Sequence, residues 1–152
     1  MAHLFLDTSA LVKYYHLEIG SPTVIALVDD PAHRCFISHI SLVEIHSAFA
    51  RRVRTGEITA AQFRQWQRRF FADLRARTFR IVRFTSVHER EAIRLLVRRG
   101  LRHPLRTLDA LQLAVAVWLR AQGSLDCFVC ADARLCAAAQ REGLRVLNPE
   151  VP

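Results

Sequence analysis

The chain alternates short apolar runs of strand type with longer segments of helical periodicity along its whole length. This alternation is typical of α/β proteins, in which helices cover both faces of a parallel sheet. The length of 152 residues, without a repeat, linker or biased segment, predicts a single domain over residues 1–152. We expect five strands, over residues 3–6, 35–38, 79–83, 127–130 and 145–147.

Two predicted helix starts have the spacing of a capping box. Thr59 is followed three residues later by Gln62, and Ser86 by Glu89. Within residues 59–77, apolar side chains recur at helical spacing, while Arg side chains fall away from them. We interpret this stripe as core or as a contact between subunits, with base stacking by its aromatic rings as the alternative. The stripe comprises Phe63, Trp66, Phe70 and Leu74.

Positive charge is concentrated in the middle of the chain. Residues 51–106 hold 16 Arg and four acidic residues, a net charge of +12, whereas the remainder has a net charge of −4. Such a basic surface suits nucleic acid or an acidic protein, and the alternative is a solvated surface that reflects an Arg-favouring composition. No apolar run is long enough to span a membrane and no basic stretch precedes Asp7, so we expect a cytoplasmic protein without a signal peptide.

Cys127 and Cys130 have the CxxC spacing found in zinc and redox sites. They lie in a strand-like run, where residues three apart point to opposite faces of the sheet, so they cannot readily share a metal ion. We therefore expect these two residues, together with Cys35 and Cys136, to be buried thiols that fill the core.

Four acidic residues interrupt apolar segments. Asp7 and Asp132 directly follow predicted strands, and Glu44 lies early in the helix after the strand at residues 35–38. In a parallel sheet these three positions start from the carboxyl edge, where α/β proteins place their sites.

We also expect Asp109 at the carboxyl edge, because of the direction in which its helix must run. Its helix must start at the carboxyl edge in order to lead into the strand at residues 127–130. The preceding helix runs away from that edge, so the connector at residues 101–106 must return to it. Six extended residues span about 20 Å, and Pro104 favours an extended path. We therefore expect all four carboxylates to meet.

Each acid also has a purely structural interpretation. The acids that follow strands can be N-caps, Asp109 can interact with a helix dipole, and Glu44 can pair with Arg51 or Lys13. Four clustered carboxylates, however, repel one another unless a cation lies among them, and no basic side chain is obviously placed to neutralise them. An oxygen-only site suits Mg²⁺ or Mn²⁺, ions that activate water and stabilise charge during phosphodiester hydrolysis.

Four segments resemble the motifs of PIN-domain ribonucleases, specifically the VapC-like toxins of type II toxin–antitoxin pairs. They are FLDTSALVKYYHLEIGS, SHISLVEIHSA, LRTLDALQLA and FVCADARLCAAAQREGLRVLNP, in the family's order and across nearly the whole chain. The resemblance implies a five-stranded parallel sheet, a divalent-metal site and endonucleolytic cleavage of RNA that leaves 5′-phosphate and 3′-hydroxyl ends. It also implies a homodimer inhibited by a cognate antitoxin, whose C-terminal segment enters the active-site groove.

The resemblance also assigns roles to individual residues. Asp7, Glu44 and Asp109 match the three most dependable acids of the catalytic metal site, and Asp132 matches the more variable fourth. Ser9 matches the hydroxyl that orients Asp7 or a metal-bound water. The implied cofactor is Mg²⁺, with Mn²⁺ as a substitute.

Two positions depart from the family's pattern. Cys130 stands where Thr is often found before the last acid, and Gln112 stands where His is common. The change at Cys130 bears on the hydrogen bonding of Asp132 and on a second metal ion. Asp126 is a rival fourth acid, but it precedes its strand and so belongs to the opposite edge.

We therefore predict a Mg²⁺-dependent endoribonuclease that acts as a toxin. One alternative is a catalytically silent PIN-fold module that binds nucleic acid or protein, although the intact acids count against it. Another is a receiver-like phosphoacceptor domain. That class needs an acidic pair after the first strand and a Lys after the last, where this chain has FLDTS and VLNPE.

Overall fold

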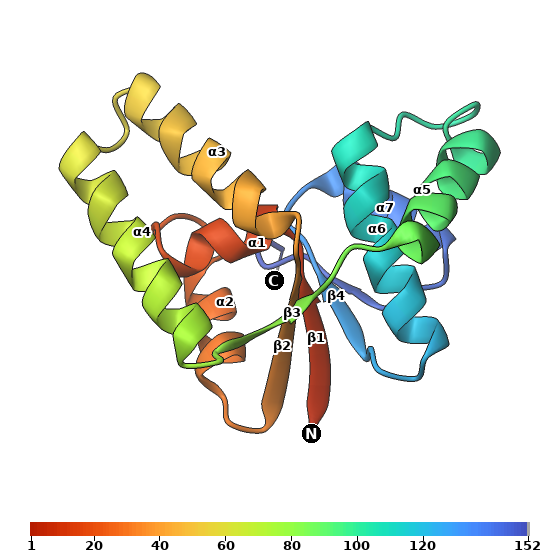
Figure 1. The fold of residues 1–152 in the computed structure, drawn as a ribbon, viewed down its shortest axis with the longest axis horizontal. Helices are drawn as coiled ribbons and strands as arrows, with labels where there is room; N and C mark the ends of the chain where they lie inside the picture. Colours follow the sequence, from red (N-terminus) through yellow and green to blue (C-terminus); the bar gives the residue numbers. More distant parts are fainter. Residues whose placement is uncertain (152) are drawn as a thin grey trace.

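Five parallel strands form one sheet in the order β3-β2-β1-β4-β5 (Figure 1). The structure is a computed structural model and describes residues 1–151. Each strand bound lies within two residues of its predicted position. The strands are β1 (Ala2–Leu6), β2 (His33–Ser38), β3 (Phe79–Val82), β4 (Cys127–Val129) and β5 (Val146–Leu147).

The helices lie in two groups on opposite faces of the sheet, as the α/β pattern predicts (Figure 1). The first group comprises α1 (Thr8–Leu11), the 3-10 helix η1 (Val12–Tyr14), α2 (Ser21–Asp29), α3 (Ser41–Arg54) and α4 (Ala60–Arg75). The second comprises α5 (Ser86–Arg99), α6 (Thr107–Ala121) and α7 (Ala133–Arg141). None of the helices within residues 1–151 is long and apolar enough to cross a membrane.

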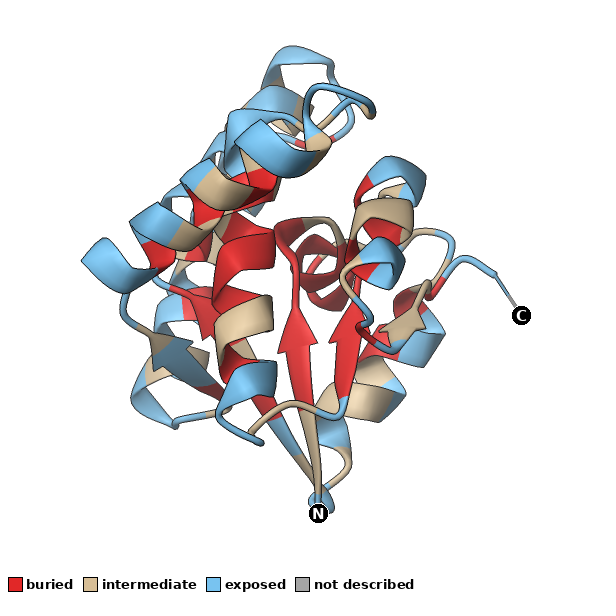
Figure 2. Ribbon diagram, turned by 90° about the vertical axis from the view of Figure 1, so that its right-hand side faces the viewer, coloured by how far each residue is buried: buried red, intermediate tan, exposed pale blue. Residues whose placement is uncertain are grey.

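Strand residues alternate between two hydrophobic cores. On β1, Leu4 and Leu6 face the core beside α1–α4, whereas Phe5 stacks on Phe128 in the core beside α5–α7. The central strands are therefore buried on both faces, as Figure 2 shows. This two-sided burial explains why they read as continuous apolar runs in the sequence.

The apolar stripe of α4 belongs to the first of these cores. Phe70 is fully buried, and Phe63, Trp66 and Leu74 pack against the same cluster. The interpretation of the stripe as core is confirmed.

One predicted capping box is confirmed and the other is displaced. At the start of α4, the Gln62 N–H donates to Thr59 Oγ1 at 3.1 Å and the Thr59 N–H donates to Gln62 Oε1 at 2.8 Å. The box predicted from Ser86 is wrong by one residue. Thr85 forms it instead, with its N–H donating to His88 Nδ1 at 3.0 Å, because a ring nitrogen can take the place of the usual carboxylate or amide oxygen.

Helix α6 begins at the carboxyl edge as predicted, since Arg106 Nη2 lies 3.0 Å from Asp132 Oδ2, just after β4. The predicted extended connector is wrong. Arg102 and His103 both donate backbone hydrogen bonds to the Arg99 carbonyl, so the connector turns at its start. In Figure 1, α5 itself rises to the level at which α6 begins. The helix therefore covers the distance that the sequence suggested for the connector.

Candidate active site

Asp7 lies at the end of β1, where its backbone N–H donates to the Val129 carbonyl at 3.0 Å. Its Oδ2 atom accepts hydrogen bonds from the Ser9 N–H at 2.9 Å and the Ser9 hydroxyl at 2.7 Å, which caps α1. Burial raises the pKa of Asp7 to about 6; the charges of Glu44 and Asp109 add to this rise, and the Ser9 hydrogen bonds oppose it. Asp7 is thus both a helix cap and a buried carboxyl group close to two other acids.

Glu44 lies in the first turn of α3. Its Oε2 atom accepts hydrogen bonds from the Thr8 hydroxyl at 2.7 Å and from the buried side-chain amide of Gln112. The predicted pairing of Glu44 with Arg51 or Lys13 is wrong, because Thr8 and Gln112 bind the carboxylate instead. The sequence indicated Gln112 only as a departure from a pattern, and the structure shows what it contacts.

One Arg side chain joins the other two predicted acids. Arg106 Nε lies 3.1 Å from Asp109 Oδ2, and Arg106 Nη2 lies 3.0 Å from Asp132 Oδ2. The second oxygen of Asp132 accepts from the N–H groups of Arg134 and Leu135 and caps α7. The expectation that no basic side chain neutralises the acids is therefore wrong. The signal that identifies Arg106 is its spacing of three residues from Asp109 at the start of one helix.

The predicted acids share the carboxyl edge, but their oxygens do not converge on one point. Within residues 1–151, no three His, Cys, Asp or Glu side chains are grouped closely enough to hold a metal ion as they stand. Glu44 is bound by Thr8 and Gln112, whereas Arg106 lies between the other pair of carboxylates. The four carboxylates thus lie at the edge where we expected them to meet. The expectation that they meet is wrong for their present orientations, because local donors compensate their charges.

The rival acid Asp126 lies at the opposite edge, as predicted. Its Oδ2 atom accepts from the backbone N–H of His3, near the start of β1, at 2.7 Å.

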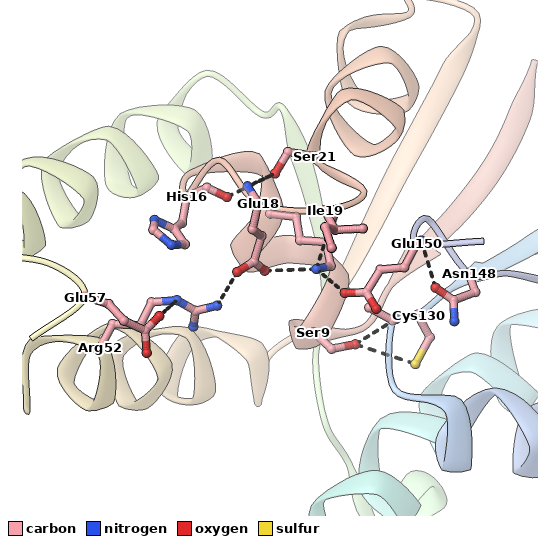
Figure 3. A network of polar contacts seen from close by, with 12 residues as sticks. Ser9, His16, Glu18, Ile19, Ser21, Arg52, Glu57, Cys130, Asn148 and Glu150 are labelled. Carbon is pink, nitrogen blue, oxygen red and sulfur yellow. Dashed lines mark hydrogen bonds and ion pairs between the residues drawn. The ribbon is translucent and has the colours of Figure 1, made fainter. Parts of the chain in front are cut away.

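A surface groove of about 350 Å³ has one of the predicted acids, Asp132, in its lining, together with Thr8, Ser9, Lys13, Arg51 and Glu150. Lys13 is buried in the wall, where its Nζ donates to Glu18 Oε1 at 2.9 Å, to the Ile19 carbonyl at 2.9 Å and to Glu150 Oε1 at 2.6 Å. Arg52 Nη2 donates to the other Glu18 oxygen at 2.9 Å (Figure 3). This network, which sequence reasoning missed, joins η1, α3 and the C-terminal segment. Its one signal is that Lys13 is the chain's only lysine.

The four cysteines are buried free thiols, as predicted. Cys127 lies in the core beside α1–α4 and Cys130 in the core beside α5–α7, so the CxxC pair faces opposite sides of the sheet. Cys130 also reaches the acids, since its Sγ lies 3.6 Å from Ser9 Oγ (Figure 3) and 3.8 Å from Asp7 Oδ2.

The sequence profile of the PIN domain matches residues 4–141, a range that includes Ser9 and all four predicted acids. The chain belongs to the PIN-domain family. No curated protein sequence matches it significantly. The parallel sheet and the acids at its carboxyl edge thus belong to a PIN domain.

Solved structures of other proteins share this PIN fold. VapC20 of Mycobacterium tuberculosis, a toxin that cleaves the sarcin-ricin loop, has a TM-score of 0.64 and 22% identity, over 89% of this chain and 94% of its own. A toxin–antitoxin complex from Klebsiella pneumoniae has a TM-score of 0.63 and 19% identity, with 96% and 97% covered. FitAcB of Neisseria gonorrhoeae has a TM-score of 0.68 and 16% identity, with 98% and 99% covered. At these identities the likeness establishes the fold.

Proposed function

We propose that this PIN domain is a Mg²⁺-dependent endoribonuclease that acts in the cytoplasm as the toxin of a type II toxin–antitoxin pair. The observation that carries the proposal is the setting of Asp7. This acid is buried at the carboxyl edge, is held by Ser9, and lies close enough to Glu44 and Asp109 for their charges to raise its pKa. Carboxyl groups perturbed in this way are typical of functional sites. The toxins among the structures of similar fold support the same proposal.

The donor chemistry of the site fits a divalent cation. Asp7, Glu44, Asp109 and Asp132 offer only oxygen ligands, which Mg²⁺ and Mn²⁺ prefer. The guanidinium group of Arg106 between two of these carboxylates indicates that they favour a positive charge. A divalent cation bound by these side chains would supply an activated water and would stabilise charge on the phosphate.

The remaining polar contacts suit the positioning of these acids. Ser9 fixes the orientation of Asp7, and the Thr8 hydroxyl and the Gln112 amide fix Glu44. Arg106 is 68% exposed, so it can leave its carboxylates without opening the core. Its planar guanidinium group is suited to bind two oxygens of an RNA phosphate.

The basic segment at residues 51–106 provides further phosphate contacts. Six of its 16 Arg residues form ion pairs with carboxylates, and the other ten form none within the described residues 1–151. Arg51 lines the same groove as Asp132. We propose that Arg residues of this segment hold the RNA backbone.

The proposed function includes two protein partners. One is a cognate antitoxin, in line with the toxin–antitoxin complex of similar fold from Klebsiella pneumoniae. The other is a second copy of the chain. Ile93, Val97 and Leu101 are exposed apolar side chains four residues apart along α5 and just beyond it, and such a stripe suits a homodimer contact.

Cleavage of RNA by the purified, metal-free protein tests this function. Cleavage should appear on addition of Mg²⁺ or Mn²⁺, and EDTA should abolish it. Asp109→Asn should remain folded and lose cleavage, whereas Asp126→Asn, at the opposite edge, is the matched control and should cleave like the parent. Equal cleavage by both variants would contradict the assignment of Asp109.

A catalytically silent binding module is the second candidate. It is favoured by the absence of any grouped set of three metal-binding side chains among residues 1–151 and by the ion pairs of Arg106. Titration calorimetry distinguishes the two functions. If millimolar Mg²⁺ and Mn²⁺ do not bind and the protein cleaves no RNA in the presence of either ion, the silent module is the correct function.

A further inference from the structure

Sheet geometry separates most of the four buried thiols from one another. Cys35 and Cys127 are both in register with Leu4, on its two neighbouring strands. Their Cα atoms are therefore two strand spacings apart, about 10 Å, beyond the ~7 Å limit for a disulfide. Both face the core beside α1–α4, whereas Cys130 and Cys136 lie in the core beside α5–α7. Cys130 and Cys136 are thus the one pair on a common side and within reach of each other.

The contacts of Cys130 and Cys136 bring the two residues together. The Cys136 thiol, on α7, donates to the Cys130 carbonyl at 3.1 Å. A carbonyl oxygen is about 2.4 Å from its own Cα, so the Cys136 sulfur lies within about 5.5 Å of the Cys130 Cα.

The two thiols face different surroundings. Cys136 lines a surface pocket of about 700 Å³ between α7 and β5, whose lining includes Ala133 and Leu147. A small oxidant can enter from this side. Cys130 faces the acids, with its Sγ 3.8 Å from Asp7 Oδ2 and 3.6 Å from Ser9 Oγ. The pair therefore connects a surface pocket to the candidate active site.

We propose that Cys130 and Cys136 are a redox modification site, at which hydrogen peroxide produces a reversible disulfide that disturbs Asp7 and Ser9. The Cys136 thiolate attacks the peroxide, so an S–O bond forms, the O–O bond breaks and hydroxide leaves with a proton as water. The Cys130 sulfur then attacks the sulfenic sulfur of Cys136. The S–S bond forms, the S–O bond breaks, and the Cys130 proton leaves with the hydroxyl group as a second water. Two thiols are oxidised and one peroxide is reduced.

The disulfide changes the site in two ways. It removes the S–H group of Cys130, which donates toward Asp7 Oδ2 in the reduced protein. The S–S bond, about 2.05 Å long, also draws the Cys130 sulfur toward α7 and away from Ser9 Oγ. In the reducing cytoplasm such a bond is transient and is typical of redox sensing. Its effect on cleavage rests on the proposed nuclease function, whereas its formation does not.

Peptide mapping and NMR test the modification itself. Treatment with hydrogen peroxide, followed by mass spectrometry of non-reduced peptides, should show a Cys130 to Cys136 link that dithiothreitol reverses. In ¹H–¹⁵N spectra the Ser9 and Ala131 amides should shift on oxidation, because one donates to Asp7 and the other to Ser9 Oγ. Cys127→Ala should behave like the parent, and Cys136→Ala should show neither change. A different pairing, no link, or an unmoved Ser9 amide would overturn the proposal.

Metal binding and cleavage test the consequence. Oxidation should lower Mn²⁺ affinity and RNA cleavage at least about tenfold in the parent, the size typical of losing a group that orients a metal ligand. Cys136→Ala should retain both after peroxide treatment. A linked protein with unchanged Mn²⁺ affinity and cleavage would overturn the switch. If the reduced parent neither binds Mn²⁺ nor cleaves RNA, the proposed nuclease function fails, while the peptide link and the amide shifts still decide the redox site.

Discussion

Asp7→Asn should stabilise the metal-free protein at neutral pH. Burial raises the folded-state pKa of Asp7 from 3.8 to about 6. This rise in the pKa corresponds to about 3 kcal/mol in the free energy of unfolding. Because the folded-state pKa is raised, the protonated form is favoured by folding. The parent therefore has its full stability below about pH 4 and loses about 3 kcal/mol as the pH rises through about 6.

Asn is neutral at every pH and can still accept the Ser9 hydrogen bonds as an N-cap. The stability difference between Asp7→Asn and the parent should thus be small near pH 4 and should grow to about 3 kcal/mol by pH 8. For a protein of this size, that gain raises the melting temperature by about 6–12 °C. Comparison of the two proteins at each pH cancels the titration of all other groups.

Thermal and urea unfolding in EDTA from pH 4 to pH 8 measure this difference. Asp7→Ala is the matched control, because it removes the charge and also the cap, and should lie below Asp7→Asn by about 1 kcal/mol at every pH. If Asp7→Asn is destabilised equally at all pH values, Asp7 is only a helix cap. Asp7→Asn should also fail to cleave RNA in Mg²⁺, although it is folded.

Arg106→Gln should raise Mn²⁺ affinity about fivefold in calorimetry and should lower RNA cleavage. The affinity rises because two exposed ion pairs of ~0.5 kcal/mol each no longer compete with the ion for Asp109 and Asp132. An unchanged Mn²⁺ affinity would exclude this competition. RNA affinity should fall steeply as the salt concentration rises. If Arg51 contacts a phosphate, Arg51→Gln should reduce the slope of log affinity against log salt by about one unit. Arg34→Gln, outside the basic segment, should leave this slope unchanged. Equal binding at all salt concentrations would contradict electrostatic recognition. Lys13→Met should lower the free energy of unfolding by about 3 kcal/mol in urea titrations, because it removes the buried cation that pairs with Glu18 and Glu150 in the groove wall. A loss below about 1 kcal/mol would show that the network is not stabilising.

The five strands and the parallel α/β class were predictable from the sequence because they follow from short-range signals. The two-faced burial of β1 and β4 appears as apolar runs, and in a parallel sheet it places Asp7 and Asp132 at one edge. Side-chain partners were not predictable in the same way. Glu44 is bound by Thr8 and Gln112, which lie 36 and 68 residues away along the chain. Such contacts depend on rotamers and on packing between elements, which no local pattern encodes.

The contacts of Arg106 are a second example of side-chain partners that the sequence does not predict. Its spacing from Asp109 is visible in the sequence, but its contact with Asp132 depends on how α5 and the connector bring the start of α6 to the end of β4. The prediction that α6 begins at the carboxyl edge was correct, although it was inferred from an extended connector that the structure does not have. The roles of the four acids and Ser9 stay predictions that the variants above test.

The central place of β1 in the sheet has a consequence for synthesis on the ribosome. β1 is the first strand to be made, yet one of its two neighbours, β4, comes only at residues 127–129. At about 5–20 residues per second, roughly 6–25 s separate the two strands during translation. Until β4 joins, Asp7 lacks both the Val129 carbonyl and the Cys130 thiol that surround it. The surroundings of Asp7 are therefore complete only when almost the whole chain has emerged, and the nuclease that we propose would be inactive on RNA beside its own ribosome until then.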